Sequence, residues 1–184
     1  MRYVDHLERH WPDSAHEDIA SARPRVAQLL PGFVVRRIAP AGPGRPWVYA
    51  TVGAAATAAA GEDGAEYVLL APAADPVLVE MLAALASVNA DPATRLGVGS
   101  VITLGRPWTA GSPADQLLVL PPYVFGPGFE RCELDDGRRI VVLWLVPITA
   151  AEARFVRQQG YKAFEELMER HAANLVDPAR PSIV

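Results

Sequence analysis

The sequence predicts one α+β domain over residues 1–184, with a central mixed, largely antiparallel sheet and three to four helices packed on it. A length of 184 residues suits a single domain, and 51% hydrophobic residues supply a core that needs no disulfide or metal. The expected strands and helices intermix without a regular strand–helix alternation. The sequence Asp135-Asp136-Gly137 also indicates a hairpin turn, which argues against an all-parallel sheet.

Composition argues against several classes of function. The formal net charge is −4 and basic residues are scattered, so we expect no nucleic-acid partner. The most apolar stretches, such as residues 140–148, reach about half of the length that a bilayer span needs, so we expect no membrane association. The charged start of the chain gives no apolar signal-peptide region, and a single cysteine, Cys132, fits a reducing compartment. These features predict a cytoplasmic protein.

Residues 1–25 are expected to form an N-terminal helix and a polar lead-in. The helix covers Tyr3–Trp11 and stops at the Pro-Asp pair that follows. Two strands come next, at residues 32–38 and 46–52, joined by a turn rich in Pro and Gly. Both faces of the second strand are apolar, which predicts an interior position in the sheet.

The middle of the chain combines a loop, a strand and a helix. Residues 53–60 hold only small side chains, which cannot fill a core, and predict a loop whose tip is residues 61–64. A strand is expected at residues 66–71. Asp75 is then a good N-cap and Pro76 suits the first helical position, and apolar residues repeat at helical spacing after them.

The second half predicts further strands. A short strand is expected at residues 99–104 and another at residues 116–120. Residues 130–134 and 138–146 flank the predicted hairpin turn. Both faces of the last of these strands are apolar, which places it centrally in the sheet.

Two helices and a tail close the chain. Thr149 and Glu152 have the spacing of a capping box, so a helix is expected to begin there. Gly160 follows as its predicted C-terminal cap residue. A last helix covers residues 161–171 with an apolar stripe, and residues 178–184 are expected to be a tail.

No motif predicts a catalytic or metal site. His6 and His10 lie four residues apart and could share a zinc ion, but a third ligand would have to come from the irregular segment that follows, so a polar helix near a frayed end is the better interpretation. Cys132 lies in a predicted strand without a visible base, which favours a small half-buried side chain. The glycine-rich residues 42–44 and 97–100 lack the lysine of a phosphate-binding loop. We therefore expect no catalytic, cofactor-binding or metal-binding residues and no cofactor.

Trp108 is the one aromatic residue that we consider for contact with a partner. It stands beside Pro107 in a predicted loop, and exposed aromatic residues are enriched at binding sites. Packing beneath the loop is the alternative and the more common outcome for such a residue.

Three segments resemble the bacterial Suppressor of fused-like domain family. The first is residues 47–53, with Trp47, Tyr49, Thr51 and Gly53, and the second is residues 66–70. The third and most specific is residues 143–152, an apolar strand ending in Val-Pro-Ile-Thr with a glutamate three residues later; its motif positions are Pro147, Ile148, Thr149 and Glu152. The resemblance spans residues 30–175, and the motif residues have mainly structural explanations.

The resemblance implies an α+β fold and a protein-binding role. Bacterial members are often inferred to be immunity proteins that neutralise a cognate toxin, and the eukaryotic member sequesters a transcription factor. The family has no agreed catalytic residues to carry over. We therefore expect a non-catalytic protein-binding module whose partner is a protein. A basic toxin domain is one such partner, because the chain is acidic. The alternative is an enzyme or small-ligand binder whose pocket the sequence does not show. Residues 40–46 and 53–64 and the Trp108 loop are the expected binding surface.

Overall fold

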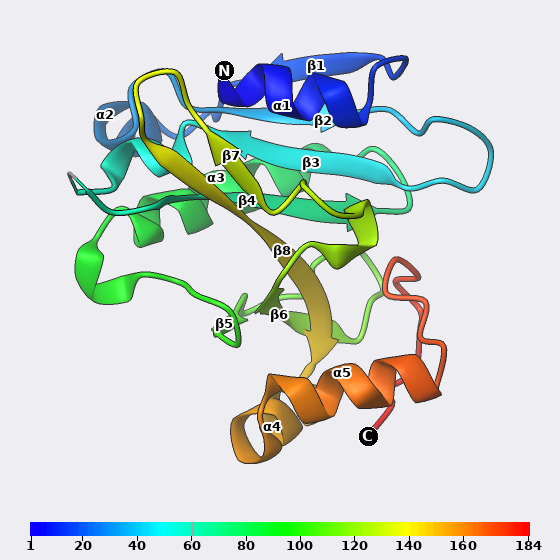
Figure 1. Cartoon of the computed structure of the whole chain (residues 1–184). Coiled ribbons are helices and arrows are strands. Elements are labelled where there is room, and N and C mark those ends of the chain that lie inside the picture. Colours follow the sequence, from blue (N-terminus) through cyan, green and yellow to red (C-terminus); the bar gives the residue numbers. More distant parts are fainter. Residues whose placement is uncertain (60) are drawn as a thin grey trace.

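A mixed β-sheet with α-helices on both faces forms the body of the protein (Figure 1). The structure is a computed structural model that describes residues 1–59 and 61–184. Over these residues the sheet has eight strands, and five α-helices are present. The predicted α+β fold is confirmed, whereas the number of helices exceeds the three to four expected.

The sheet combines one parallel strand pair with antiparallel ones. Its order is β1-β2-β3-β4-β8-β6-β5, and β7 pairs with the beginning of β8. Among the described strands, only β4 and β8 run parallel. The strands are β1 (His16–Ile19), β2 (Val34–Ile38), β3 (Trp47–Val52), β4 (Gly64–Ala71), β5 (Val101–Thr103), β6 (Ala114–Leu120), β7 (Arg131–Glu133) and β8 (Arg139–Thr149).

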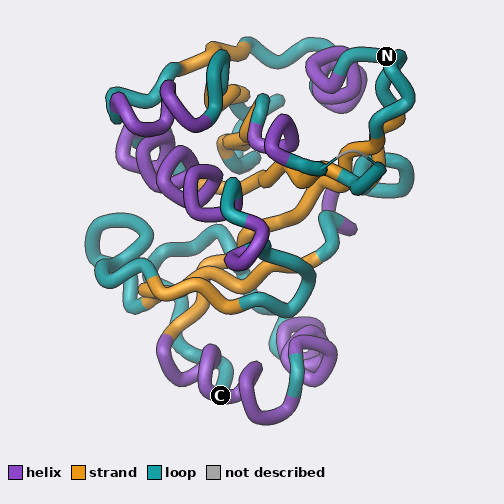
Figure 2. The backbone as a smooth tube through the Cα atoms, turned by 90° about the vertical axis from the view of Figure 1, so that its left-hand side faces the viewer, coloured by secondary structure: helices purple, strands orange, loops and turns teal. Residues whose placement is uncertain are grey.

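The helices divide between the two faces of the sheet (Figure 2). One hydrophobic cluster contains side chains of α2 and α3, and the other contains side chains of α1, α4 and α5. The α-helices are α1 (Tyr3–His10), α2 (Pro24–Leu29), α3 (Pro76–Asn89), α4 (Ala150–Gln159) and α5 (Tyr161–Arg170), and the short 3₁₀ helices are η1 (Ala54–Thr57), η2 (Pro92–Thr94) and η3 (Tyr123–Phe125).

Strand β8 has apolar side chains on both faces because helices cover the sheet on both sides. Leu143 and Leu145 pack in the cluster beneath α3, and Val142 and Trp144 pack in the cluster beneath α4 and α5. Alternate side chains of a strand point to opposite faces, so a strand covered by helices on both sides needs apolar residues throughout. The predicted central position of this strand is confirmed.

Two elements were not predicted: β1 lies within the polar lead-in, and α2 begins at the end of that lead-in and stops before the first predicted strand. β1 is almost entirely exposed and forms an edge of the sheet. Its carboxylates pair with the neighbouring strand, Asp18 with Arg36 and Glu17 with Arg37. A strand held by ion pairs has no apolar alternation, and the sequence pattern therefore gave no signal for it.

The predicted end of β8 at residue 146 is wrong, because the strand continues through Pro147 to Thr149. The N and carbonyl O of a strand residue point to the same side. The carbonyl O of Pro147 accepts a hydrogen bond from Arg180 of the C-terminal segment, 3.0 Å away, so the proline ring faces that segment. The missing N–H therefore leaves the pairing with β6 intact.

Two further predictions are modified. Within residues 53–60, expected to be a loop, residues 54–57 form the short helix η1, and residue 60 lies outside the described residues. Residues 178–184, expected to be a tail, form no helix or strand, but Arg180 is buried against the sheet. In the part of the chain that the structure describes, no helix combines the length and the hydropathy needed to cross a bilayer.

Candidate interaction surface

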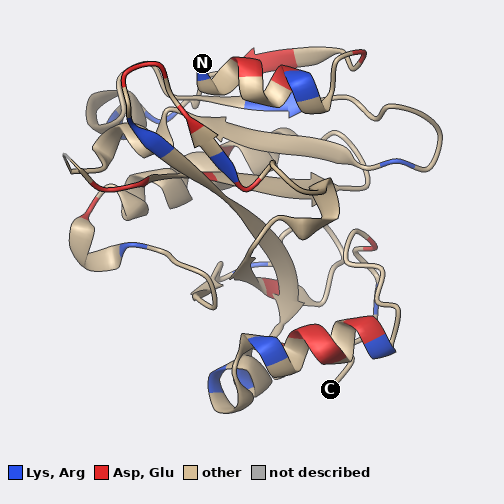
Figure 3. Cartoon of the chain, viewed as in Figure 1, with Lys and Arg blue, Asp and Glu red and all other residues tan. Residues whose placement is uncertain are grey.

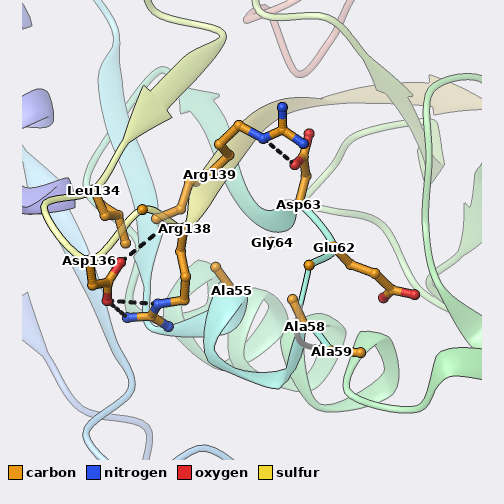
Figure 4. A pocket seen from close by; sticks show the side chains of 13 residues that line it. Ala55, Ala58, Ala59, Glu62, Asp63, Gly64, Leu134, Asp136, Arg138 and Arg139 are labelled. Atoms are coloured by element: carbon orange, nitrogen blue, oxygen red, sulfur yellow. Dashed lines mark hydrogen bonds and ion pairs between the residues drawn. The ribbon is translucent and has the colours of Figure 1, made fainter.

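A groove of about 620 Å³ opens where β4 and β8 begin (Figure 4). We call it the hairpin groove. One side is the small-residue segment around η1, with Ala55, Ala58 and Ala59, and the other side is the turn between β7 and β8, residues 134–139. The parallel pairing of Gly64 with Ile140 brings these two segments together, although they are far apart in the sequence.

Charged side chains surround the hairpin groove. Arg139 Nε lies 2.8 Å from Asp63 Oδ1, and Arg138 Nη2 lies 2.8 Å from Asp136 Oδ2 (Figure 4). The backbone N–H of Arg138 and then its guanidinium lower the pKa of Asp136. Both arginines are about 60% exposed, at 61% and 62%. Exposed pairs of this kind contribute little to stability, so they can exchange their partners for the charges of another protein.

A buried glutamate anchors the small-residue segment. Glu66 of β4 is 1% exposed, and its Oε1 accepts hydrogen bonds from the N–H groups of Gly53 (2.8 Å) and Ala55 (3.1 Å). Its Oε2 accepts the hydroxyl of Thr51 at 2.5 Å. Burial raises the pKa of Glu66 to about 7, although these hydrogen bonds oppose the shift. The carboxylate therefore fixes the turn that leaves β3 and with it one wall of the hairpin groove.

Gly53 is required at this turn. Its φ is +104°, and a Cβ there would approach Phe33 Cα to 3.3 Å. Thr51 and Gly53 of the family motif thus act as one unit with Glu66. Their role is to shape the loop.

A second, smaller hollow lies on the other side of the same segment. Its volume is about 270 Å³, and it shares Ala55, Ala58 and Gly64 with the hairpin groove. Arg95 borders it and pairs with Glu62. The small-residue segment therefore stands between two hollows and presents short side chains to both.

The described residues around the hairpin groove bring no nucleophile and base together. Glu66 is buried, and both of its carboxylate oxygens accept hydrogen bonds. Cys132 is 1% exposed in β7, and burial raises the pKa of its thiol. Across residues 1–59 and 61–184, no group of three His, Cys, Asp or Glu side chains could hold a metal ion.

The two histidines considered as zinc ligands both bond backbone carbonyls. His6 Nε2 lies 3.0 Å from the carbonyl O of Phe129, and its ring stacks on the Phe129 ring at 5.5 Å. His10 Nδ1 lies 2.9 Å from the carbonyl O of His6. His6 is therefore a buried part of an aromatic cluster and not part of a polar helix face. Burial lowers its pKa.

Trp108 is buried, so the interpretation as an exposed partner contact is wrong and the alternative, packing beneath its loop, is confirmed. The side chain is 2% exposed, and Nε1 donates to Ser112 Oγ at 2.9 Å. Ser112 also accepts the N–H of Ala114 at the start of β6. The tryptophan thus closes the loop onto the core beneath α3.

The three segments expected to form one binding surface do not meet. Residues 40–46 join β2 to β3, whereas residues 53–64 follow the opposite end of β3 (Figure 1). Of the three, only residues 53–64 line the hairpin groove. The other wall was not predicted, because Arg138 and Arg139 were assigned only to a hairpin. No local sequence pattern predicts that β8, the second strand of this hairpin, pairs with β4.

The motif residues also lie in separate regions. Trp47 is partly buried, and Tyr49 is buried with its hydroxyl accepting the N–H of Asp75 at 2.7 Å. Ile148 is fully buried at the far end of β8. The predicted capping box is confirmed, since Thr149 Oγ1 accepts the N–H of Glu152, whose carboxylate accepts the N–H of Thr149. Burial favours a higher pKa for Glu152, but hydrogen bonds from Arg180 and Thr149 lower it.

Charge is distributed unevenly over the molecule (Figure 3). Acidic and basic side chains alternate around the hairpin groove, whereas Glu165, Glu166 and Glu169 form an acidic stretch on α5. Tyr123, 50% exposed on η3, donates its hydroxyl to Glu165. The acidic character of the chain is therefore not concentrated at the hairpin groove.

Comparison with known proteins gives one family and several similar structures. The family model described as Suppressor of fused protein (SUFU) matches residues 33–181. A crystal structure described as that of a SUFU homologue from Neisseria gonorrhoeae FA 1090 superposes with a TM-score of 0.85 at 26% identity, over 98% of this chain and 94% of that chain. No curated protein matches the sequence.

Two more distant structures share the fold alone. The structure of the Sufu–Fu complex matches with a TM-score of 0.71 and 13% identity, over 98% of this chain and 90% of that chain. Drosophila Suppressor of Fused matches with a TM-score of 0.72 and 12% identity. The match covers 99% of this chain but 50% of the Drosophila chain.

Proposed function

The chain belongs to the Suppressor of fused protein family, and from that membership we propose that it is a non-catalytic protein-binding module of the cytoplasm. More specifically, we propose an immunity protein that binds and neutralises a cognate toxin with a basic surface. The bacterial setting and the toxin are parts of the proposal. A relative of this fold has been crystallised with another protein, Fu, which supports binding as the activity.

The hairpin groove is the observation that carries the proposal. Its small-residue wall lets a partner approach the backbone closely, and its exposed ion pairs can be exchanged for contacts across an interface. Loops held on a rigid sheet are where recognition usually occurs. Glu66 provides such rigidity, because it accepts hydrogen bonds from Gly53 and Ala55 of the segment and from Thr51 at the end of β3.

A small-molecule site is the second candidate, because about 620 Å³ lies within the range of ligand pockets. The chemistry of the lining favours it less. Ligand sites combine an apolar pocket with a few convergent buried polar groups, whereas the charged groups here are exposed and already paired.

The test is capture of a partner with the intact chain as bait, followed by purified binding. Ala58→Arg places a long charged side chain into the hairpin groove. Ala73→Arg is the matched control, because Ala73 is exposed in the connection between β4 and α3. We expect wild type and Ala73→Arg to bind the same protein, and Ala58→Arg to bind it at least about tenfold more weakly.

The immunity role needs a second measurement. The captured protein is expressed alone and together with the chain, and growth is recorded. We expect toxicity that wild type suppresses and Ala58→Arg does not. Equal binding by all three proteins would place the interface elsewhere. Turnover in a broad hydrolase and transferase screen, abolished by a groove substitution, would contradict the binding-module interpretation.

A further inference from the structure

The last residues of the chain contact the junction of β8 and α4 through hydrogen bonds of Arg180. We call residues 178–184 the strap. It forms no helix or strand, yet Arg180 is only 7% exposed. Glu152, which it contacts, is fully buried at 0%. The strap is therefore held by specific polar contacts and not by a backbone ladder.

Both terminal nitrogens of the Arg180 guanidinium donate hydrogen bonds at the junction of β8 and α4. Nη1 donates to Glu152 Oε1 at 2.6 Å, and Nη2 donates to Glu152 Oε2 at 2.9 Å. Nη2 also donates to the carbonyl O of Pro147 at 3.0 Å. Paired N–H···O bonds of this kind are the strong, geometrically specific way to recognise a guanidinium group.

Two contacts extend the recognition along the strap. The backbone N–H of Ile183 donates to Glu152 Oε1 at 3.1 Å. Thr149 Oγ1 donates to Ser182 Oγ at 3.2 Å. A side chain and a main-chain N–H three residues apart are thus bound together, as in the recognition of an extended peptide.

The receiving residues form one preassembled unit. Thr149 and Glu152 hold each other through the capping box, which uses Glu152 Oε2 and the hydroxyl of Thr149. Within the described structure, the hydrogen-bond donors to Glu152 Oε1 come only from the strap. A buried carboxylate oxygen without a donor is costly, so Glu152 Oε1 requires another donor whenever the strap is absent.

We propose that Pro147, Thr149 and Glu152 form a recognition site for an arginine-bearing peptide, which the strap fills in cis and which a segment of a second protein fills in trans. The ligand has an arginine, followed three residues later by an aliphatic residue with a free N–H. Arg180 is buried and Ile183 packs against the cluster that contains α4 and α5, but no residue of the strap pairs with a described strand, so the strap can leave without opening the sheet. The site lies at the opposite end of the 11-residue β8 from the hairpin groove, roughly 30 Å away.

The test uses the full chain with Arg180→Ala and a fluorescent synthetic peptide with the sequence of residues 178–184. A second peptide has alanine in place of the arginine. Fluorescence anisotropy should show that the variant binds the arginine peptide at least about tenfold more tightly than the alanine peptide. Wild type should bind it at least about tenfold more weakly than the variant does, because the tethered strap competes at a high effective concentration.

Thermal unfolding supplies an independent measurement. Arg180→Ala should lower the melting temperature by about 10 °C, since it leaves Glu152 as an unpaired buried charge. Saturating arginine peptide should restore most of that loss, and the alanine peptide should not. Glu152→Gln in the same background should abolish peptide binding. Arg170→Ala, which removes an exposed arginine of α5, is the matched control and should behave as wild type.

Equal affinity of the Arg180→Ala protein for the two peptides would show a purely structural ion pair and overturn the proposal. If Arg180→Ala does not fold, Arg180→Lys takes its place in the same titration, because lysine keeps the charge and loses the two-pronged bonding. Tighter binding of the arginine peptide than of the alanine peptide then supports the proposal, and equal affinity overturns it. Ala58→Arg should leave peptide binding unchanged, so failure of this site is distinguishable from failure of the hairpin groove.

Discussion

At the scale of single residues, the buried carboxylate of Glu66 links the sequence motif to the shape of the surface. The motif residues Thr51 and Gly53 donate hydrogen bonds to it, and the N–H of Ala55 donates a third. The sequence showed the spacing of these residues but not their common acceptor. Glu66 was placed in a strand, and nothing in a strand pattern distinguishes an exposed glutamate from one that is 1% exposed.

Glu66 should make stability depend on pH. Its folded pKa of about 7 lies above the unfolded value, so the native state holds the proton longer than the unfolded state. The contribution of Glu66 to the unfolding free energy is therefore fully present below its unfolded pKa and is lost as pH rises through about 7. Relative to Glu66→Gln, wild type should lose up to about 3 kcal/mol of unfolding free energy between pH 4 and pH 8. Urea unfolding across this range measures the difference, and parallel curves for the two proteins would contradict it.

Trp108 should be a stability residue. It is 2% exposed and packs in the core beneath α3, so Trp108→Ala should cost about 3–5 kcal/mol of unfolding free energy by chemical denaturation. Trp108→Phe keeps most of the apolar volume and loses the bond to Ser112, and it should cost clearly less. Equal losses would assign the effect to the hydrogen bond. A loss below about 1 kcal/mol for alanine would show that the loop collapses onto the cavity.

At the scale of elements, the boundaries set by local chemistry were predictable and those set by tertiary contacts were not. Asp75 and Thr149 cap their helices as predicted, because capping depends on residues within one turn. Strand β8 extends beyond its predicted end, because the carbonyl O of Pro147 accepts a hydrogen bond from Arg180, which is distant in sequence. Strand β1 was not predicted, because ion pairs with β2 stabilise it and its sequence has no apolar alternation.

The start of α4 gives a test at this scale. Thr149→Ala removes the acceptor for the N–H of Glu152 and should cost about 1–2 kcal/mol of unfolding free energy. Thr149→Ser keeps the hydroxyl and should stay close to wild type in the same denaturant series. Equal losses for both would mean that the methyl group, and not the cap, carries the effect.

At the scale of the whole molecule, the fold class was predictable and the binding surface was not. Strand and helix patterns predicted an α+β fold with a central β8, because burial on both faces leaves an apolar signature. The hairpin groove arises from the pairing of β4 with β8, which no local pattern encodes. The family resemblance identified Thr149 and Glu152 but not Arg180, since the strap lies beyond residue 175.

The net charge of −4 gives a prediction at the same scale. If the partner is basic, its association rate should fall about tenfold when salt is raised from about 0.05 to about 0.5 M, because screening removes long-range attraction. Stopped-flow mixing measures this rate. Ala58→Arg should act more on dissociation, because it removes short-range contacts. An association rate that is independent of salt would exclude a basic partner.

The parallel pairing of β4 with β8 also has a consequence for biosynthesis. The ribosome releases β1 to β4 as a meander of antiparallel strands long before it makes β8. Until then the edge of β4, with the apolar side chains of Tyr67, Val68 and Leu69, has no neighbour. Closing the loop between the two strands is entropically slow, so the nascent chain spends time with an open, aggregation-prone edge. Chaperone engagement during translation should therefore centre on β4 and end when β8 emerges.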